Sequence, residues 1–194
     1  MDQLNEKKET LSLADPVSVG DVIDERYKLT EIIGRGGAGL VFRATDLNLE
    51  RDVAVKILSR EAVHNQESLR KFEQESQILR RLHAQNTVFF YDGGRTAQDL
   101  PYIVMELVRG QQLKDLLKQE GHLSPKRTVA ILVQVLSALS EAHQYGFIHR
   151  DLKPGNIMLC RRPGFPDDFV KVLDFGIAKF VFDDSSSTGD MAGT

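Results

Sequence analysis

The feature that most constrains the fold of this chain is a glycine-rich segment with strand-like sequence on both sides. The segment reads Gly34-Arg35-Gly36-Gly37-Ala38-Gly39. It follows YKLTEII at 27–33 and precedes LVFRATD at 40–46, and both stretches are strand-like. Because glycine adopts backbone conformations that other residues avoid, the segment predicts a turn between two antiparallel strands. A third strand is predicted at 52–58, so this part of the chain is expected to form a β-meander.

The glycine spacing G-x-G-x-x-G has several interpretations besides a simple hairpin turn. A Rossmann fingerprint needs a helix after the glycines, but Leu40-Val41-Phe42 is strand-like. A Walker loop needs Gly-Lys-Ser/Thr, and Leu40 and Val41 stand there instead. A flap between two strands, with valine two places after the last glycine, fits Gly34 through Val41 fully. Such a flap brings backbone amides close to phosphate oxygens without an intervening side chain.

The predicted strand DVAVKIL at 52–58 carries Lys56 among apolar residues. A lysine can lay its stem along an apolar surface and reach water, and taken alone this is the simplest interpretation. If the flap covers a nucleotide, however, Lys56 is expected near the phosphates, on the same strand face as the small Ala54. A buried ammonium in that position requires a counter-charge.

A helix predicted at 66–83 offers this counter-charge. Glu75 shares a helix face with the apolar Phe72 and Leu79, so it is expected to point inward. Glu73 lies about 200° around the helix from it and is expected to face water. The alternative for Glu75 is an ordinary solvated glutamate, but its apolar neighbours favour a pair with Lys56.

The remaining pattern predicts a mixture of strands and helices, preceded by a flexible leader over residues 1–25. Strands are predicted at 87–93, 101–108, 157–160 and 169–175, and helices at 113–119 and 125–145. Ser124-Pro125 is a favourable start for the long helix, and Gly146 is a favourable end. Apolar residues along that helix predict deep burial at positions 129, 132, 133, 136 and 139.

Two further motifs follow in order along the chain. His149-Arg150-Asp151-Leu152-Lys153-Pro154-Gly155-Asn156 matches H-R-D-L-x-x-x-N without a mismatch, and Asp174-Phe175-Gly176 comes after it. Together with the glycine flap and Lys56, they make the sequence resemble the eukaryotic-type serine/threonine protein kinases, in the form found in bacteria. The resemblance extends over residues 26–194.

The resemblance implies an α+β, protein-kinase-like fold. Its N-lobe, at 26–107, is expected to have a five-stranded antiparallel sheet and one long helix. An incomplete and mainly helical C-lobe is expected at 108–194. The implied activity is transfer of the ATP γ-phosphate to Ser or Thr hydroxyls of proteins, with Mg²⁺ as the metal.

The resemblance also assigns roles to the catalytic residues. Asp151 is expected to accept the hydroxyl proton, and Lys153 to neutralise charge on the phosphoryl group in transfer. Lys56 and Glu75 are expected to form the phosphate-binding ion pair. Asn156 and Asp174 are expected to bind Mg²⁺ through oxygen atoms.

The nucleotide site is expected to combine the flap with residues that surround the adenine. Met105 is expected behind the base, while Glu106 and Val108 offer backbone groups to its edge. Val41, Ala54 and Met158 are expected to enclose the ring. The full set implied by the resemblance is Ile33, Gly34, Arg35, Gly36, Gly37, Ala38, Gly39, Leu40, Val41, Ala54, Lys56, Met105, Glu106, Val108 and Met158.

Composition and charge exclude several other classes. The formal net charge is -3, so there is no broad basic field for nucleic acid. The single cysteine, Cys160, permits no internal disulfide and no cysteine-based zinc cluster. The N-terminus lacks an apolar signal region, and no apolar run is long enough to span a bilayer. A cytoplasmic location is expected, with any membrane anchor of a full-length parent lying beyond Thr194.

One departure from the family bears on activity. The sequence ends at Ala192-Gly193-Thr194, before the proline-containing segment and the Ala-Pro-Glu motif that follow in the family. The alternative to an active kinase is therefore a truncated ATP-binding or regulatory fragment without transfer activity. A small-molecule phosphotransferase is disfavoured, because such enzymes usually lack a contiguous HRDLKPGN.

Overall fold

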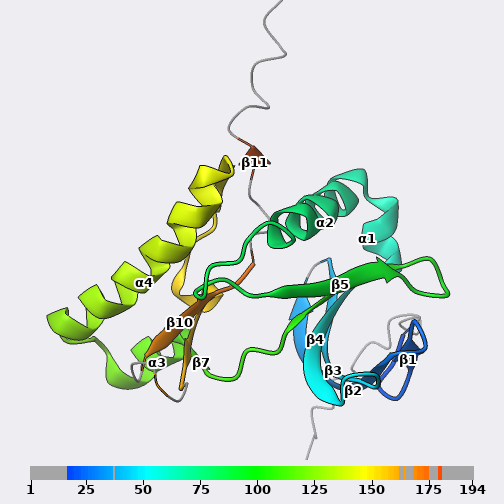
Figure 1. Ribbon diagram of the computed structural model, residues 1–194, viewed down its shortest axis with the longest axis horizontal. Helices are drawn as coiled ribbons and strands as arrows, with labels where there is room; N and C mark the ends of the chain where they lie inside the picture. Colours follow the sequence, from blue (N-terminus) through cyan, green and yellow to red (C-terminus); the bar gives the residue numbers. More distant parts are fainter. Residues whose placement is uncertain (1–16, 37, 162–163, 165–167, 175–178, 181–194) are drawn as a thin grey trace, which may run out of the picture.

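The structure is a computed structural model that describes residues 17–36, 38–161, 164, 168–174 and 179–180. It consists of an antiparallel sheet with two helices, followed by a part that is mainly helical (Figure 1). The predicted α+β class is therefore confirmed. Gly37, Phe175, Gly176 and the serine-rich stretch after 182 lie outside the described residues.

The sheet has six strands in the order β1-β2-β3-β4-β6-β5. Their bounds are β1 Val22–Ile23, β2 Tyr27–Gly36, β3 Gly39–Asp46, β4 Arg51–Leu58, β5 Phe90–Arg95 and β6 Pro101–Glu106. Every neighbouring pair in this sheet is antiparallel. The meander predicted around the glycine segment is formed by β2, β3 and β4.

The structure differs from the sequence prediction at the start of the chain. Five strands were expected after a leader reaching residue 25, but Val22 and Ile23 form a sixth strand paired with Lys28 and Tyr27. Val17 is also buried against the sheet. Two paired residues are too short for an alternating pattern to reveal, so this edge strand left no periodic signal.

The strand register gives the sheet two different faces. Phe42, Val55 and Val104 lie side by side across β3, β4 and β6 and belong to a core on one face. Val41, Lys56 and Ile103 are the next cross-strand set and point to the opposite face, because side chains alternate along a strand. The lysine therefore stands on the sheet face that does not contain this core.

Two helices follow β4, namely α1 Arg60–His64 and α2 Gln66–Leu79. The Asn65 side chain caps α2 by accepting a hydrogen bond from the Ser68 amide at 3.0 Å. The predicted helix continued to residue 83, but α2 ends at Leu79 and residues 80–81 form a turn. Leu82 follows this turn and is buried, so its apolar side chain extended the apparent helical pattern.

The second part contains the remaining elements. They are β7 Gln111–Gln112, α3 Leu113–Glu120, α4 Pro125–Gln144, β8 Phe147–Ile148, the 3-10 helix η1 Pro154–Asn156, β9 Ile157–Cys160, β10 Phe169–Val172 and β11 Lys179–Phe180. Ser124 caps α4 by accepting from the Arg127 amide at 3.3 Å, and Pro125 is in the first turn. One hydrophobic cluster joins the two parts, since it contains Phe72 of α2 and Ile131 of α4.

The burial predicted for α4 is wrong for most of its positions. The buried side chains are Ile131, Val135, Ala138 and Ala142. Among the described residues, a second apolar stripe remains uncovered, with exposed fractions of 49–61% at Val129, Leu132, Val133 and Leu136. The helix thus has two apolar stripes, and the sequence pattern could not tell which one is packed.

Candidate active site

Lys56 and Glu75 form a close ion pair between β4 and α2. The Lys56 ammonium donates hydrogen bonds to both Glu75 oxygens, at 2.7 and 2.6 Å. The Glu75 side chain is only 5% exposed and that of Lys56 is 22% exposed. Glu73, by contrast, is exposed to solvent. The predicted pairing and the predicted orientations of the two glutamates are confirmed.

The electrostatics of this pair keep Lys56 charged. Burial alone lowers the pKa of an ammonium, but the negative charges of Glu75 and then Asp174, together with the Glu75 hydrogen bonds, outweigh it. The pKa of Lys56 is therefore raised above its ordinary value. Asp174 contributes because its Oδ1 lies 3.8 Å from the ammonium. The charged ammonium can bind an anionic group, and the exposed Asp174 carboxylate beside it can bind a cation.

The loop that contains Asp151 is held by its own side chains. Lys153 donates to Asp151 Oδ2 at 2.6 Å, and Asn156 donates to the Asp151 backbone carbonyl at 2.9 Å. The hydrogen bond from Lys153, together with its charge, outweighs the opposing effect of desolvation and lowers the pKa of the Asp151 carboxyl. Asp151 is therefore ionised at neutral pH and can accept a proton or a hydrogen bond.

His149 is buried beneath this loop and connects it to the end of β10. Its Nδ1 accepts a hydrogen bond from the Asp151 amide at 3.3 Å, and its Nε2 lies 3.1 Å from the Leu173 carbonyl. Both contacts are satisfied when the ring is neutral with its hydrogen on Nε2, because Nδ1 must then accept and Nε2 must donate. His149 thus fixes the distance between the Asp151 loop and residue 173.

A backbone hydrogen bond joins the segments that carry Asp174 and Asn156. The Leu173 amide donates to the Asn156 carbonyl at 2.8 Å, which places Asp174 directly after a residue bonded to the Asp151 loop. Asp174 has φ of 52°, in the left-handed region that aspartate tolerates better than most residues. Its side chain is 60% exposed and available to a ligand.

These two residues match the ligand chemistry of magnesium. Mg²⁺ in phosphoryl-transfer sites is held by one or two protein oxygens together with substrate phosphates. Asn156 uses its amide nitrogen for the Asp151 carbonyl, which directs its amide oxygen elsewhere. Among the described residues, no group of three or more His, Cys, Asp and Glu side chains comes together. The candidate donor set is therefore one carboxylate and one amide oxygen.

The glycine segment approaches the sheet closely at its second half. A Cβ placed at Gly39 would meet the Ile57 carbonyl oxygen at 2.1 Å, so only glycine fits there. The Ala38 carbonyl accepts from the Ser59 amide at 3.0 Å. At Gly34, a Cβ would lie 3.3 Å from the Val41 Cβ. Arg35 and Gly36 are exposed, and Gly37, also predicted to bind nucleotide, lies outside the described residues.

The residues predicted to surround the adenine come from the sheet and from the segments that follow it. Ala54 is paired with Met105 across β4 and β6, and Val41 is paired with Lys56 across β3 and β4. Ile33 is exposed near the glycine segment, in β2. Val108 follows β6, and Met158 lies in β9 opposite Gln112. Val41, Ala54, Met105 and Lys56 therefore share one face of the sheet.

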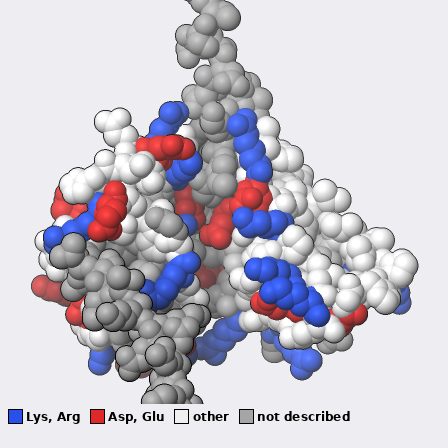
Figure 2. Space-filling view, turned by 180° about the vertical axis from the view of Figure 1, so that it is seen from behind, with Lys and Arg blue, Asp and Glu red and all other residues white. Residues whose placement is uncertain are grey.

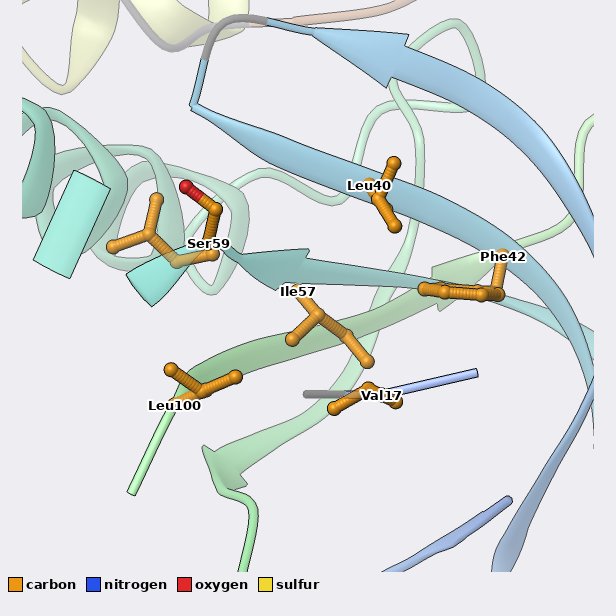
Figure 3. Close-up of a pocket in the computed structure, with 7 residues that line it drawn as sticks. Val17, Leu40, Phe42, Ile57, Ser59 and Leu100 are labelled. Atoms are coloured by element: carbon orange, nitrogen blue, oxygen red, sulfur yellow. The ribbon is translucent and has the colours of Figure 1, made fainter. Parts of the chain in front are cut away.

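Leu40 does not belong to this group by its side chain. It is paired with Ile57 and lines a small apolar pocket on the core side of the sheet (Figure 3). Val17, Phe42 and Leu100 line the same pocket. The prediction that Leu40 contacts the nucleotide is therefore corrected for its side chain, because alternation along β3 places this side chain on the face opposite Val41. Only the backbone of Leu40 still belongs to the glycine flap.

A second buried lysine was missed by the sequence reasoning. Lys171 in β10 donates to Glu106 Oε2 at 2.7 Å and to the Thr87 carbonyl at 2.9 Å. Its ammonium also lies 4.3 Å from the centre of the Phe89 ring. The pair connects β10 to the segment that was predicted to bind the adenine edge. Its signal was available in FVKV, where a lysine again interrupts an apolar strand.

Residues 83–86 connect the two parts of the molecule, and this was also not predicted. Glu141 of α4 accepts hydrogen bonds from the His83 and Ala84 amides at 2.8 and 2.7 Å. Asn86 donates to the Val170 carbonyl at 2.8 Å. The turn after α2 is therefore attached to α4 and β10, which fixes the Glu75 helix relative to the Asp151 loop.

Comparison with known proteins identifies the family to which this chain is similar. The protein kinase domain family matches residues 27–194. The chain is 44% identical over 171 residues to serine/threonine-protein kinase pkn3 of Myxococcus xanthus, covering 88% of this chain and 31% of that protein. It is 40% identical over 173 residues to serine/threonine-protein kinase PknB of Mycobacterium tuberculosis, covering 88% of this chain and 27% of that protein.

A third relative is the probable serine/threonine-protein kinase PknB of Bifidobacterium longum. Identity is 42% over 171 residues, covering 84% of this chain and 24% of that protein. The chain thus spans less than a third of the length of the three relatives named here. No described helix is both long and apolar enough to cross a membrane.

Proposed function

The chain belongs to the protein kinase domain family, and on that premise we propose that it is a serine/threonine protein kinase that transfers the γ-phosphate of ATP to Ser or Thr hydroxyls of proteins. The observation that carries the proposal is an unbroken series of contacts. Glu75 binds Lys56, Lys56 lies 3.8 Å from Asp174, and Asp174 follows Leu173. The Leu173 amide in turn bonds the Asn156 carbonyl, and the Asn156 amide group bonds the Asp151 carbonyl.

In the proposed mechanism, Asp151 orients the attacking hydroxyl and receives its proton. Phosphoryl transfer needs positioning and charge neutralisation more than covalent catalysis by the protein. The lowered pKa of Asp151 keeps the carboxylate ionised, so it accepts a hydrogen bond from the hydroxyl. Lys153, which contacts the same carboxylate, lies next to the path of the phosphoryl group and neutralises charge there.

The other half of the proposed site holds the nucleotide. Lys56, kept charged and oriented by Glu75, binds phosphate oxygens. Asp174 and Asn156 would hold Mg²⁺ through their oxygen atoms, and the ion would neutralise charge on the phosphate groups. The exposed carboxylate of Asp174 and its short distance to Lys56 favour this assignment. The face formed by Val41, Ala54 and Met105 accepts the adenine, and backbone groups of Glu106 and Val108 recognise its edge.

The proposed boundary between the two lobes lies in the segment that connects β6 to β7. β6 ends at Glu106 and β7 begins at Gln111, so an N-lobe at 26–107 and a C-lobe from 108 meet in this short connection. On the face in Figure 2, positive and negative side chains are interspersed without one large field of either sign. Protein substrates and ATP are therefore the proposed partners, rather than nucleic acid. A cytoplasmic location is proposed because ATP is available there and Cys160 can form no internal disulfide.

The proposal is tested by incorporation of labelled phosphate from Mg·ATP into a generic protein substrate. The full chain is compared with Asp151→Asn, which keeps the shape of the side chain but cannot accept a proton as a carboxylate does. We expect incorporation by the natural sequence and a loss of about 100-fold or more in the variant. Equal background signal from both proteins would contradict transfer activity.

A binding measurement distinguishes the alternative of an ATP-binding fragment. Thermal stabilisation by Mg·ATP is expected to survive in Asp151→Asn and to disappear in Lys56→Met. If that pattern appears while the natural sequence transfers no phosphate, the chain binds nucleotide without catalysis. If Mg·ATP stabilises neither the natural sequence nor Asp151→Asn, the nucleotide site itself is refuted.

A further inference from the structure

We propose that this kinase site prefers substrates with an acidic residue near the target serine or threonine, and that Lys114 of α3 is the residue that recognises the acidic group. This inference rests on the proposed function, because it names the substrate class of the same site. It goes further in assigning a role to a residue that takes no part in phosphoryl transfer.

Lys114 lies against the loop that carries Asp151. A Cβ placed at Gly155 would lie 3.8 Å from the Lys114 Cδ, and apart from the neighbouring Pro154 and Asn156 no other residue would lie within 4 Å of it. Gly155 stands between Lys153 and Asn156, so the aliphatic stem of Lys114 runs along the catalytic loop. Lys114 is therefore the side chain that a substrate group approaching the loop at Gly155 would meet first, and its ammonium is within reach of such a group.

The Lys114 ammonium is available for such a contact. Its residue is exposed, and among the described residues no carboxylate forms an ion pair with it. One turn further along α3, Lys118 has a partner in Asp115 at 3.7 Å. The two lysines are thus on the same helix, but only Lys114 combines contact with the catalytic loop and an unpaired charge.

The chain segments around Lys114 carry more cations than carboxylates. Segments 108–114 and 148–156 form the connection to α3 and the catalytic loop. They contain Arg109, Lys114, Arg150 and Lys153 but only one carboxylate, Asp151, and the next residue, Asp115, is paired with Lys118. Arg109 is paired with Asp52, and Lys153 is paired with Asp151. A substrate carboxylate next to the target hydroxyl would add the missing negative charge, whereas a substrate lysine or arginine would be repelled.

The expected preference is moderate, because both charges are partly hydrated. Exposed ion pairs contribute little individually, so we expect an acidic peptide to exceed its neutral counterpart by about two- to ten-fold in kcat/KM. A basic peptide is expected to fall below the neutral one by a similar factor. Since the effect is electrostatic, raising the salt concentration is expected to reduce both differences.

The test uses the full chain and a panel of peptides, each made in two versions, one with serine and one with threonine as the target residue. Glu, Gln or Lys is placed in turn at each of the three positions before and after the target hydroxyl. The natural sequence is compared with Lys114→Glu and with the control Lys118→Glu, which makes the same charge change one turn away. For Lys114→Glu we expect a reversed preference, from Glu to Lys, at one position in the panel, while KM for ATP stays unchanged. For Lys118→Glu we expect the preference of the natural sequence.

The possible outcomes separate this inference from the proposed function. Transfer at equal rates to Glu, Gln and Lys peptides at every position would overturn the role of Lys114 and leave the kinase activity standing. The same change of preference in both variants would also overturn it, because the effect would then reflect net charge alone. Absence of transfer to any peptide by the natural sequence would refute the proposed function, and this inference with it.

Discussion

Replacing Glu75 with glutamine removes the charge that faces Lys56 and preserves the shape of the side chain. Two unit charges 4 Å apart attract by about 4 kcal/mol at an effective dielectric constant of 20. Glutamine retains one neutral acceptor worth about 1 kcal/mol, and the partial exposure of Lys56 reduces the difference further. Asp174, 3.8 Å from the ammonium, replaces part of the lost charge. We therefore expect Glu75→Gln to lower the free energy of unfolding by about 2 kcal/mol.

The assay is urea unfolding of the full chain at pH 7, followed by circular dichroism. A double-mutant cycle combines Glu75→Gln with Lys56→Met, so that the interaction between the two side chains is separated from their other contacts. The pKa of Lys56 is raised above 10.5 in the folded chain. Its contribution is therefore complete at pH 7 and is lost only as the pH rises through the folded-state pKa.

The matched control is Glu73→Gln on the same helix, because Glu73 is exposed. We expect this control to change the free energy of unfolding by less than about 0.5 kcal/mol. A coupling between Lys56 and Glu75 below about 0.5 kcal/mol would refute the reasoning that this pair is a buried, structure-defining interaction.

Three further predictions concern other parts of the site. Gly39→Ala is expected to lower the thermal stability of the chain and weaken nucleotide binding in a thermal-shift measurement, because the new Cβ would meet a strand carbonyl at 2.1 Å. Gly36→Ala is the control and should be tolerated, because the atom nearest to its new Cβ lies 3.9 Å away. Lys171→Met is expected to cost about 2–4 kcal/mol in urea unfolding, because it leaves a partly buried carboxylate without its cation. Lys153→Ala is expected to raise the pKa of Asp151 toward its ordinary value, so that the acid limb of the residual activity moves to higher pH; an unmoved limb would contradict the assigned contact.

The sequence was most informative where the signal is local. The Lys56–Glu75 pair followed from one lysine in an apolar strand and one glutamate on the apolar face of a helix. Asp151, Lys153 and Asn156 lie within six residues of one another, so a contiguous motif could place them in one loop. In both cases the periodicity of a strand or helix, or the spacing of a motif, contained the relevant geometry.

The sequence was less informative where contacts join distant segments. Glu106 meets Lys171, and Glu141 meets His83 and Ala84, across long stretches of chain. Neither residue belongs to a local pattern that names its partner. Long-range pairing of this kind depends on how the elements pack, which periodicity does not specify. The same limit explains why the wrong apolar stripe of α4 was expected to be buried.

The prediction for Leu40 shows a different limit. A family motif assigns its whole glycine segment to the nucleotide, whereas strand alternation separates the side chains of neighbouring residues. Leu40 and Val41 are adjacent in the motif, yet their side chains lie on opposite faces of the sheet. Alternation alone, applied to β3, contained this information.

The central claim is that Lys56 and Asp174, from different parts of the chain, act on the phosphates of one nucleotide. Calorimetric titration tests it directly, with Mg·ATP and with adenosine as ligands for the natural sequence, Lys56→Met and Asp174→Asn. The account predicts that each variant binds Mg·ATP at least about tenfold more weakly and binds adenosine, which has no phosphate, with unchanged affinity. Unchanged Mg·ATP affinity in either variant, or a parallel loss of adenosine binding, would contradict it.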